Sequence, residues 1–179
     1  MFRSNYRSIE IVSGPSFWRS AGCVALGLFA QTAFAPLLVV HGGIPSFVTI
    51  AVVLYALRLG ARRGALLGLA AGVLTDAVAG TGGAWTLTYT VLALLCGAVS
   101  RGFFSDGAVL PSLFVGAAVI ARSALFWAIM SAEGYPRGFG AVHLHAALES
   151  GALTALYAFV YLVFRTRFGG EQTRIERYS

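Results

Sequence analysis

Residues 60–80 read GARRGALLGLAAGVLTDAVAG, and a glycine or an acid recurs there at every fourth position. These positions are Gly60, Gly64, Gly68, Gly72, Asp76 and Gly80. Residues four apart lie nearly above one another on an α-helix, so the glycines predict a groove without side chains along one face. In water each glycine would disfavour the helix by roughly 1 kcal/mol relative to alanine, but close helix packing in lipid uses small residues. The stretch therefore predicts a tightly packed membrane helix.

The composition of the whole chain supports this interpretation. Of its 179 residues, 58% are hydrophobic and 11% are charged, whereas soluble domains have about 45–50% apolar and about 25% charged residues. The sequence therefore predicts an all-α integral membrane protein. We expect one compact bundle over residues 16–168, flanked by cytoplasmic tails at 1–15 and 169–179, with no separate soluble domain.

Six apolar segments predict six transmembrane helices in this bundle. The segments cover residues 18–40, 45–59, 64–79, 84–100, 109–130 and 142–164. The second, third and fourth are close to the lower limit of about 17 residues for a spanning helix. Flanking residues must therefore extend these helices, or the bilayer must thin locally.

The arginines predict the orientation of the bundle. The chain has 13 basic residues, all of them arginine, and a net charge of +6. Apart from Arg122 within a span, only Arg137 lies on the side of the membrane opposite to all the others. The positive-inside rule then puts both termini in the cytoplasm. Because these arginines lie at membrane edges, we expect them to meet anionic lipid rather than nucleic acid.

Three ionisable residues, Asp76, Arg122 and Glu149, fall within the predicted spans. Burying any of them alone would cost at least about 2.5 kcal/mol, so each needs a partner or water. Since the fifth and sixth segments run antiparallel, we expect Arg122 and Glu149 to pair, with Asp76 or water as a third member of a buried polar cluster. Such a pair could fix helix register, which we favour, or form a binding or proton site.

Asp76 has two interpretations of its own, because it precedes the turn Gly80-Thr81-Gly82-Gly83. Aspartate commonly accepts hydrogen bonds from backbone N–H groups at turns. The favoured interpretation is that its carboxylate orients this outer loop and the start of the fourth helix. The alternative is that it meets a partner protein or ligand at the membrane surface.

The sequence carries no enzyme signature. A Gly-x-Ser-x-Gly elbow, a His-Glu-x-x-His motif and a phosphate-binding glycine loop are all missing. His145 and Glu149 are one helical turn apart, but His143 falls on roughly the opposite face, and no cysteine or second acid joins them in sequence. We therefore expect a non-enzymatic protein without a metal site or cofactor.

The outer loop between the fifth and sixth segments is a candidate contact surface. It contains Tyr135, Arg137 and Phe139, which are residue types enriched at protein interfaces. An aromatic belt at the membrane interface would explain the two aromatic residues nearly as well.

Residues 36–104 resemble the rod shape-determining protein MreD family. The resemblance rests on Pro45 at the start of the second segment, the basic turn at 58–63, the glycine stripe and a fourth segment that ends Gly97-x3-Arg101. It implies a non-enzymatic inner-membrane scaffold subunit of the bacterial cell-elongation machinery. The implied partners are MreC, the RodA glycosyltransferase with its penicillin-binding transpeptidase, and MreB filaments.

On this interpretation the stripe packs the bundle or docks a partner's transmembrane helix, and the outer loops face the periplasmic stem of MreC. A rival from another class is the substrate-binding subunit of an energy-coupling-factor vitamin transporter, which is similar in size and expected fold. Such a subunit needs a ligand pocket near the outer face. Asp76, Arg122 and Glu149 could supply its polar groups.

Overall fold

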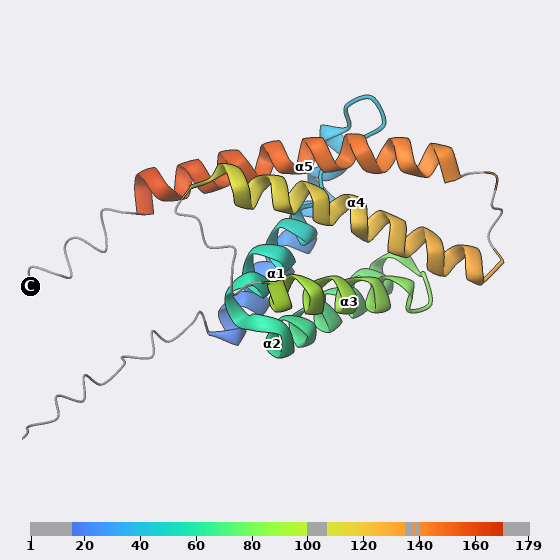
Figure 1. The fold of residues 1–179 in the computed structure, drawn as a ribbon, viewed down its shortest axis with the longest axis horizontal. Helices are drawn as coiled ribbons and strands as arrows, with labels where there is room; N and C mark the ends of the chain where they lie inside the picture. Colours follow the sequence, from blue (N-terminus) through green and yellow to red (C-terminus); the bar gives the residue numbers. More distant parts are fainter. Residues whose placement is uncertain (1–15, 100–106, 135–137, 139, 170–179) are drawn as a thin grey trace, which may run out of the picture.

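The structure is a computed structural model that describes residues 16–99, 107–134, 138 and 140–169, and this part of the chain is all-helical (Figure 1). The elements in chain order are α1 (Phe17–Ala33), the short 3₁₀ helix η1 (Ala35–Leu38), α2 (Phe47–Ala79), α3 (Ala84–Val99), α4 (Val109–Ala132) and α5 (Gly140–Gly169). The predicted all-α class is confirmed for these residues.

The chain reverses direction inside α2, at Gly60. This residue has φ 77° and ψ 176°, a backbone conformation that is essentially restricted to glycine. A Cβ atom on Gly64 would lie 3.2 Å from the Cβ of Ala56, although eight residues of continuous helix would separate them by about 12 Å. The second and third predicted segments are therefore the two halves of α2, residues 47–59 and 61–79.

The helix count differs from the prediction of six separate helices, because the described part of the chain forms five α-helices. Two of them are long and apolar enough to cross a membrane: α4, with 24 residues, and the 28 residues of α5 from Gly140 to Arg167. The others are shorter or interrupted, since α1 has 17 residues, α3 has 16 and α2 breaks at Gly60. Six membrane crossings thus remain a prediction.

The helices pack in pairs. The first half of α2 packs against α1, the second half packs against α3, and α4 runs alongside α5 over most of its length (Figure 1). A buried core joins these pairs, and its members from four helices include Val24, Val48, Val52, Val53, Ala56, Leu67, Ala71, Tyr89 and Val115.

The glycine stripe is filled by the chain's own α3. A Cβ on Gly68 would collide with the carbonyl oxygen of Tyr89, and one on Gly72 would lie 2.7 Å from the carbonyl oxygen of Trp85. Gly64 is close to α3 as well, because its Cβ would lie 3.0 Å from the carbonyl oxygen of Ala93. Of the two roles left open for the stripe, packing within the bundle is therefore the one the structure has.

The two end members of the stripe have a different role from the one expected. Gly60 forms the reversal inside α2, and Gly80 ends the helix in the left-handed conformation, with φ 68°. The Gly80 N–H donates to the carbonyl oxygen of Asp76 at 2.7 Å. These glycines are required by backbone conformation, whereas Gly64, Gly68 and Gly72 are required by the close approach of α3.

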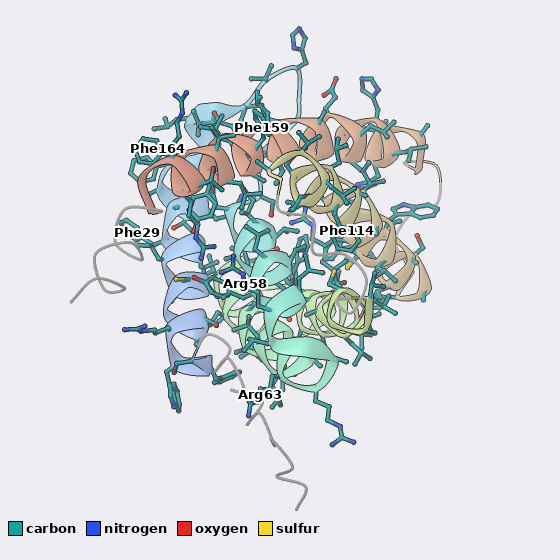
Figure 2. All side chains as sticks on the ribbon, turned by 60° about the vertical axis from the view of Figure 1, so that its left-hand side comes forward. Phe29, Arg58, Arg63, Phe114, Phe159 and Phe164 are labelled. Carbon is teal, nitrogen blue, oxygen red and sulfur yellow. The ribbon has the colours of Figure 1, made fainter. Side chains whose placement is uncertain are left out.

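The outward faces of the helices are strongly apolar. Trp18 on α1 is 80% exposed, and Phe29 projects from the outer side of α1 (Figure 2). Large apolar side chains are exposed on each of the five helices, for example Leu26, Leu66, Leu95, Leu113 and Val142. An apolar surface of this kind requires lipid or a partner protein to cover it.

Candidate functional site

Asp76 holds the start of α3. Its Oδ1 accepts hydrogen bonds from the Thr81 hydroxyl at 2.5 Å and from the Trp85 N–H at 3.1 Å. Its Oδ2 accepts from the N–H and the hydroxyl of Thr86, at 2.8 and 2.6 Å. Four donors thus satisfy the carboxylate, and two of them are N–H groups of the first turn of a helix that would otherwise lack partners. The favoured interpretation of Asp76 as the residue that orients this turn and helix is confirmed.

Arg122 lies among hydroxyl groups rather than acids. Its Nη1 donates to the Ser46 Oγ at 2.9 Å, the Tyr89 hydroxyl at 3.2 Å and the Thr49 Oγ1 at 3.3 Å. The guanidinium carbon lies 5.1 Å from the centre of the Trp85 ring, which is a cation–π distance. Arg122 on α4 therefore joins the start of α2 to α3.

This polar cluster is held in place by its own members. Ser46, Thr49 and Tyr89 are buried, and their hydroxyls bond one another, at 2.7 Å between Ser46 and Thr49 and 3.2 Å between Thr49 and Tyr89. The ring of Phe126 stacks on the ring of Trp85, with the two ring centres 4.1 Å apart. Hydroxyl dipoles and a π face thus replace the carboxylate that a buried arginine usually pairs with.

The expected pair of Arg122 with Glu149 does not form. Glu149 lies 24% exposed on α5, and its Oε1 is 3.1 Å from the Nε2 of His145. The chain segment before α2 explains the difference, because a Cβ on Gly43 would lie 2.8 Å from the backbone carbon of Glu149. This segment lies against α5, and it presents Ser46 to Arg122. Within the described residues, no ion pair joins Asp76, Arg122 and Glu149, so they do not form one charged cluster.

Side chains from two other helices satisfy the backbone before α2. The Ser46 N–H donates to the Thr154 Oγ1 at 3.0 Å, and the Phe47 N–H donates to the Gln31 Oε1 at 2.8 Å. Two further bonds complete the set, from Gln31 Nε2 to the Pro45 carbonyl at 3.1 Å and from the Ile44 N–H to the Ser150 Oγ at 3.0 Å. Sequence reasoning missed these residues because it followed charge. The sequence feature that could have indicated them is the presence of uncharged hydrogen-bonding side chains, such as Gln31 and Thr154, within apolar segments.

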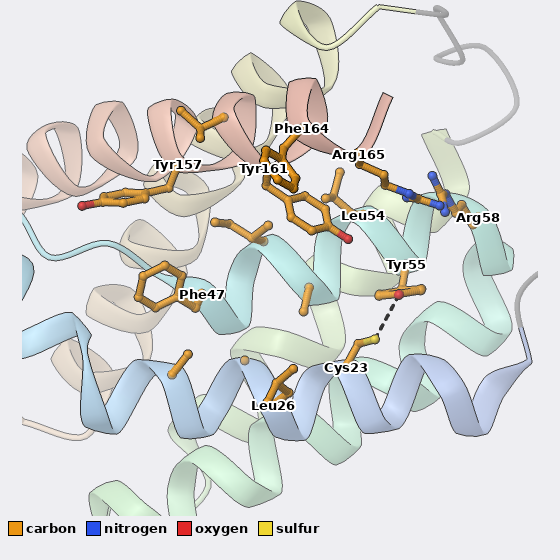
Figure 3. A pocket seen from close by; sticks show the side chains of 15 residues that line it. Cys23, Leu26, Phe47, Leu54, Tyr55, Arg58, Tyr157, Tyr161, Phe164 and Arg165 are labelled. Atoms are coloured by element: carbon orange, nitrogen blue, oxygen red, sulfur yellow. Dashed lines mark hydrogen bonds between the residues drawn. The ribbon is translucent and has the colours of Figure 1, made fainter. Parts of the chain in front are cut away.

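A groove of about 500 Å³ lies between α1, the first half of α2 and α5 (Figure 3). Its walls are mainly apolar and include Leu26, Ala30, Phe47, Ala51, Leu54 and Val160. Arg58 and Arg165 line one end of it, together with Tyr55 and Tyr161. Its lining comes from three separate stretches of sequence, so no local motif indicated it. The sequence analysis placed Arg58 and Arg165 on the same side of the membrane, and this was the only indication that they meet at one end of the groove.

The groove is separate from the predicted site residues. Asp76, Arg122, Glu149 and the glycine stripe do not line it. The candidate contact residues Tyr135, Arg137 and Phe139, and the tail at 1–15, lie outside the described residues, as does the tail after Gly169. The groove is thus the described feature best suited to hold an apolar molecule.

The described residues contain no group of three or more His, Cys, Asp or Glu side chains that could hold a metal ion. Comparison of the chain with protein-family models, curated proteins and solved structures found no match. The function must therefore be argued from the residues and their arrangement alone.

Proposed function

We propose that this chain is a non-enzymatic, multi-pass scaffold of the bacterial inner membrane. In this role, which the MreD resemblance suggests, it binds MreC and links it to RodA and the transpeptidase. The observation that carries the proposal is how the charged interior groups are used. Asp76 and Arg122 make hydrogen bonds to other groups of the chain, and each of the five described helices exposes large apolar side chains.

The internal contacts favour a binding protein over a transporter subunit. A ligand pocket built on Arg122 would need the guanidinium to face a cavity, but its Nη1 is occupied by hydroxyls of the same chain. The glycine stripe is likewise occupied by α3. Partner helices must therefore dock on the outward faces, where apolar side chains are already exposed.

Six membrane crossings fit these elements when the two halves of α2 cross separately. The crossings would be α1, residues 47–59, residues 61–79, α3, α4 and α5. The half at 47–59 is too short to span about 30 Å of hydrocarbon by itself. The segment before it suits this arrangement, because irregular backbone at membrane depth requires partners from the protein, and Gln31 and Thr154 provide them.

Photo-crosslinking in the native cell tests the proposal. A photoreactive amino acid at Leu66, which is 56% exposed on α2, should capture MreC, RodA or the transpeptidase. The neighbouring Leu67 is 0% exposed and is the matched control, which should capture none of them. The same scan at Leu95 and Leu113 covers the outward faces of α3 and α4.

Two results would reject the scaffold function. One is capture of a transmembrane subunit coupled to ATPases, which would make the chain a transporter component. The other is capture of no elongation protein from any outward position although the chain is inserted and expressed.

A further inference from the structure

We propose that the groove between α1, the first half of α2 and α5 binds one anionic phospholipid, with the phosphate between Arg58 and Arg165 and an acyl chain along the apolar walls. The inference rests on the membrane location in the proposed function, and it is independent of the proposed protein partners.

The length of the groove matches one leaflet of a bilayer. Phe47 and Arg58 both line it, and at about 1.5 Å per residue the helix between them extends about 16 Å. Half of a hydrocarbon core is about 15 Å thick. With the arginines at the level of the headgroups, the apolar part of the groove therefore covers one leaflet.

The walls of the groove suit an acyl chain. An extended hydrocarbon chain needs no hydrogen-bond partners, and walls such as Leu26, Ala51 and Leu54 offer few.

The charge at the end of the groove selects an anion. Arg58 on α2 and Arg165 on α5 extend toward each other (Figure 3), and their like charges repel. None of the described residues that line the groove is acidic. A phosphate between the two guanidinium groups would remove the repulsion and accept hydrogen bonds from both, since the planar guanidinium fork matches phosphate oxygens.

Two tyrosines form a polar rim at the cationic end of the groove. Tyr55 and Tyr161 line it beside the arginines, and the Tyr55 hydroxyl donates to the Cys23 Sγ at 3.0 Å, which ties α1 to α2 (Figure 3). Amphipathic rings at headgroup depth are typical of membrane interfaces. The order along the groove is thus apolar wall, aromatic rim and cationic end, which is the order of chemistry along a phospholipid.

Native mass spectrometry of the delipidated full-length chain in detergent tests the proposal, with dioleoyl phosphatidylglycerol as the probe. We expect one lipid per chain to bind to the wild type. The double variant R58Q/R165Q should bind it about tenfold more weakly, because each arginine near an anionic headgroup contributes a few-fold in affinity. R62Q/R63Q removes the same charge from exposed residues that do not line the groove, and it should bind as the wild type does.

Two further variants separate the charge from the groove. R58K/R165K keeps both charges and should retain most of the binding. Ala51→Phe narrows the groove and leaves the arginines in place, so it too should weaken binding; Ala51→Ile is the milder replacement if the first does not fold. Circular dichroism confirms that each variant is folded.

The proposal would be overturned if R58Q/R165Q bound the lipid as tightly as the wild type. It would also be overturned if R62Q/R63Q lost as much affinity for the lipid as R58Q/R165Q. The proposal would also be overturned if millimolar inorganic phosphate displaced the lipid and Ala51→Phe bound the lipid as tightly as the wild type. Together these two results would place the anion site outside the groove. Capture of a protein helix in cells by a photoreactive group at Leu54 would likewise overturn the proposal. Loss of all crosslinks from Leu66 with lipid binding intact would instead reject only the scaffold function.

Discussion

The Nη1 of Arg122 lies 2.9 Å from the Oγ of Ser46, 76 positions earlier in the chain, and donates a hydrogen bond to it. This bond fastens α4 to the residue that precedes α2. The guanidinium is held by hydroxyls and an indole ring instead of an acid, so the charge serves the packing of three helices rather than an ion pair.

Replacing Arg122 with alanine should lower the free energy of unfolding by about 2 kcal/mol, because it leaves buried hydroxyls of Ser46, Thr49 and Tyr89 without their donor. Denaturation by SDS in mixed micelles, followed by tryptophan fluorescence, measures the change. Arg62→Ala, at an exposed position, is the control.

A second substitution distinguishes this network from an ion pair. Adding Glu149→Ala to Arg122→Ala should not restore stability, since Glu149 contacts His145 instead. Partial rescue by the second substitution would contradict the arrangement.

Asp76→Ala should loosen the start of α3 and cost about 2–3 kcal/mol, because four donors lose their acceptor. Hydrogen exchange of the amides at 84–90 should accelerate. Thr86→Val removes one of these bonds and should cost about 1 kcal/mol. Thr90→Val is the matched control, since the Thr90 hydroxyl bonds only to a carbonyl of its own helix. Unchanged exchange in Asp76→Ala would show that the cap does not hold the helix.

Gly68→Ala should destabilise the protein, even though alanine is the better helix former by about 1 kcal/mol. The added methyl group would meet the Tyr89 carbonyl and the Ala93 side chain, so the second half of α2 and α3 must separate. Gly22→Ala on α1 is the control, because nothing lies within 4 Å of the added atom. The midpoint temperature of thermal unfolding in detergent should fall for Gly68→Ala, and it should stay the same or rise for Gly22→Ala. An increase for both variants would mean that helix propensity outweighs packing.

Gly60→Ala should cost about 1–3 kcal/mol although open space surrounds it, because its φ of 77° and ψ of 176° suit only glycine. The expected defect is in the reversal between the halves of α2. Hydrogen exchange of the amides at 57–64 reports on it and should accelerate in Gly60→Ala. Unchanged exchange would show that the reversal does not depend on glycine.

The helices could largely be predicted from the sequence, since apolar segments at 109–130 and 142–164 correspond to α4 at Val109–Ala132 and α5 at Gly140–Gly169. The role of Asp76 was also predictable, because its donors follow within ten positions. The break at Gly60 could be predicted only in part. The basic turn at 58–63 indicated a boundary between two helices, but Gly60 also fitted the four-residue spacing of the glycine stripe, which is typical of a continuous helix.

Hydropathy and residue spacing are sufficient to predict which segments are helical, that the chain is apolar enough for lipid and that small residues allow a close crossing, because these patterns act within a few helical turns. Only the tertiary structure decided which helix fills the glycine stripe, that Ser46 and not Glu149 faces Arg122, and that Arg58 and Arg165 meet at one end of a groove. The contacts of the stripe join residues 13 to 29 positions apart, and the other two pairs are 76 and 107 positions apart. Which residues meet depends on how whole helices pack against one another. Arg122 could pair with Ser46 or with Glu149 on chemical grounds alone, and only the positions of the helices decide between them.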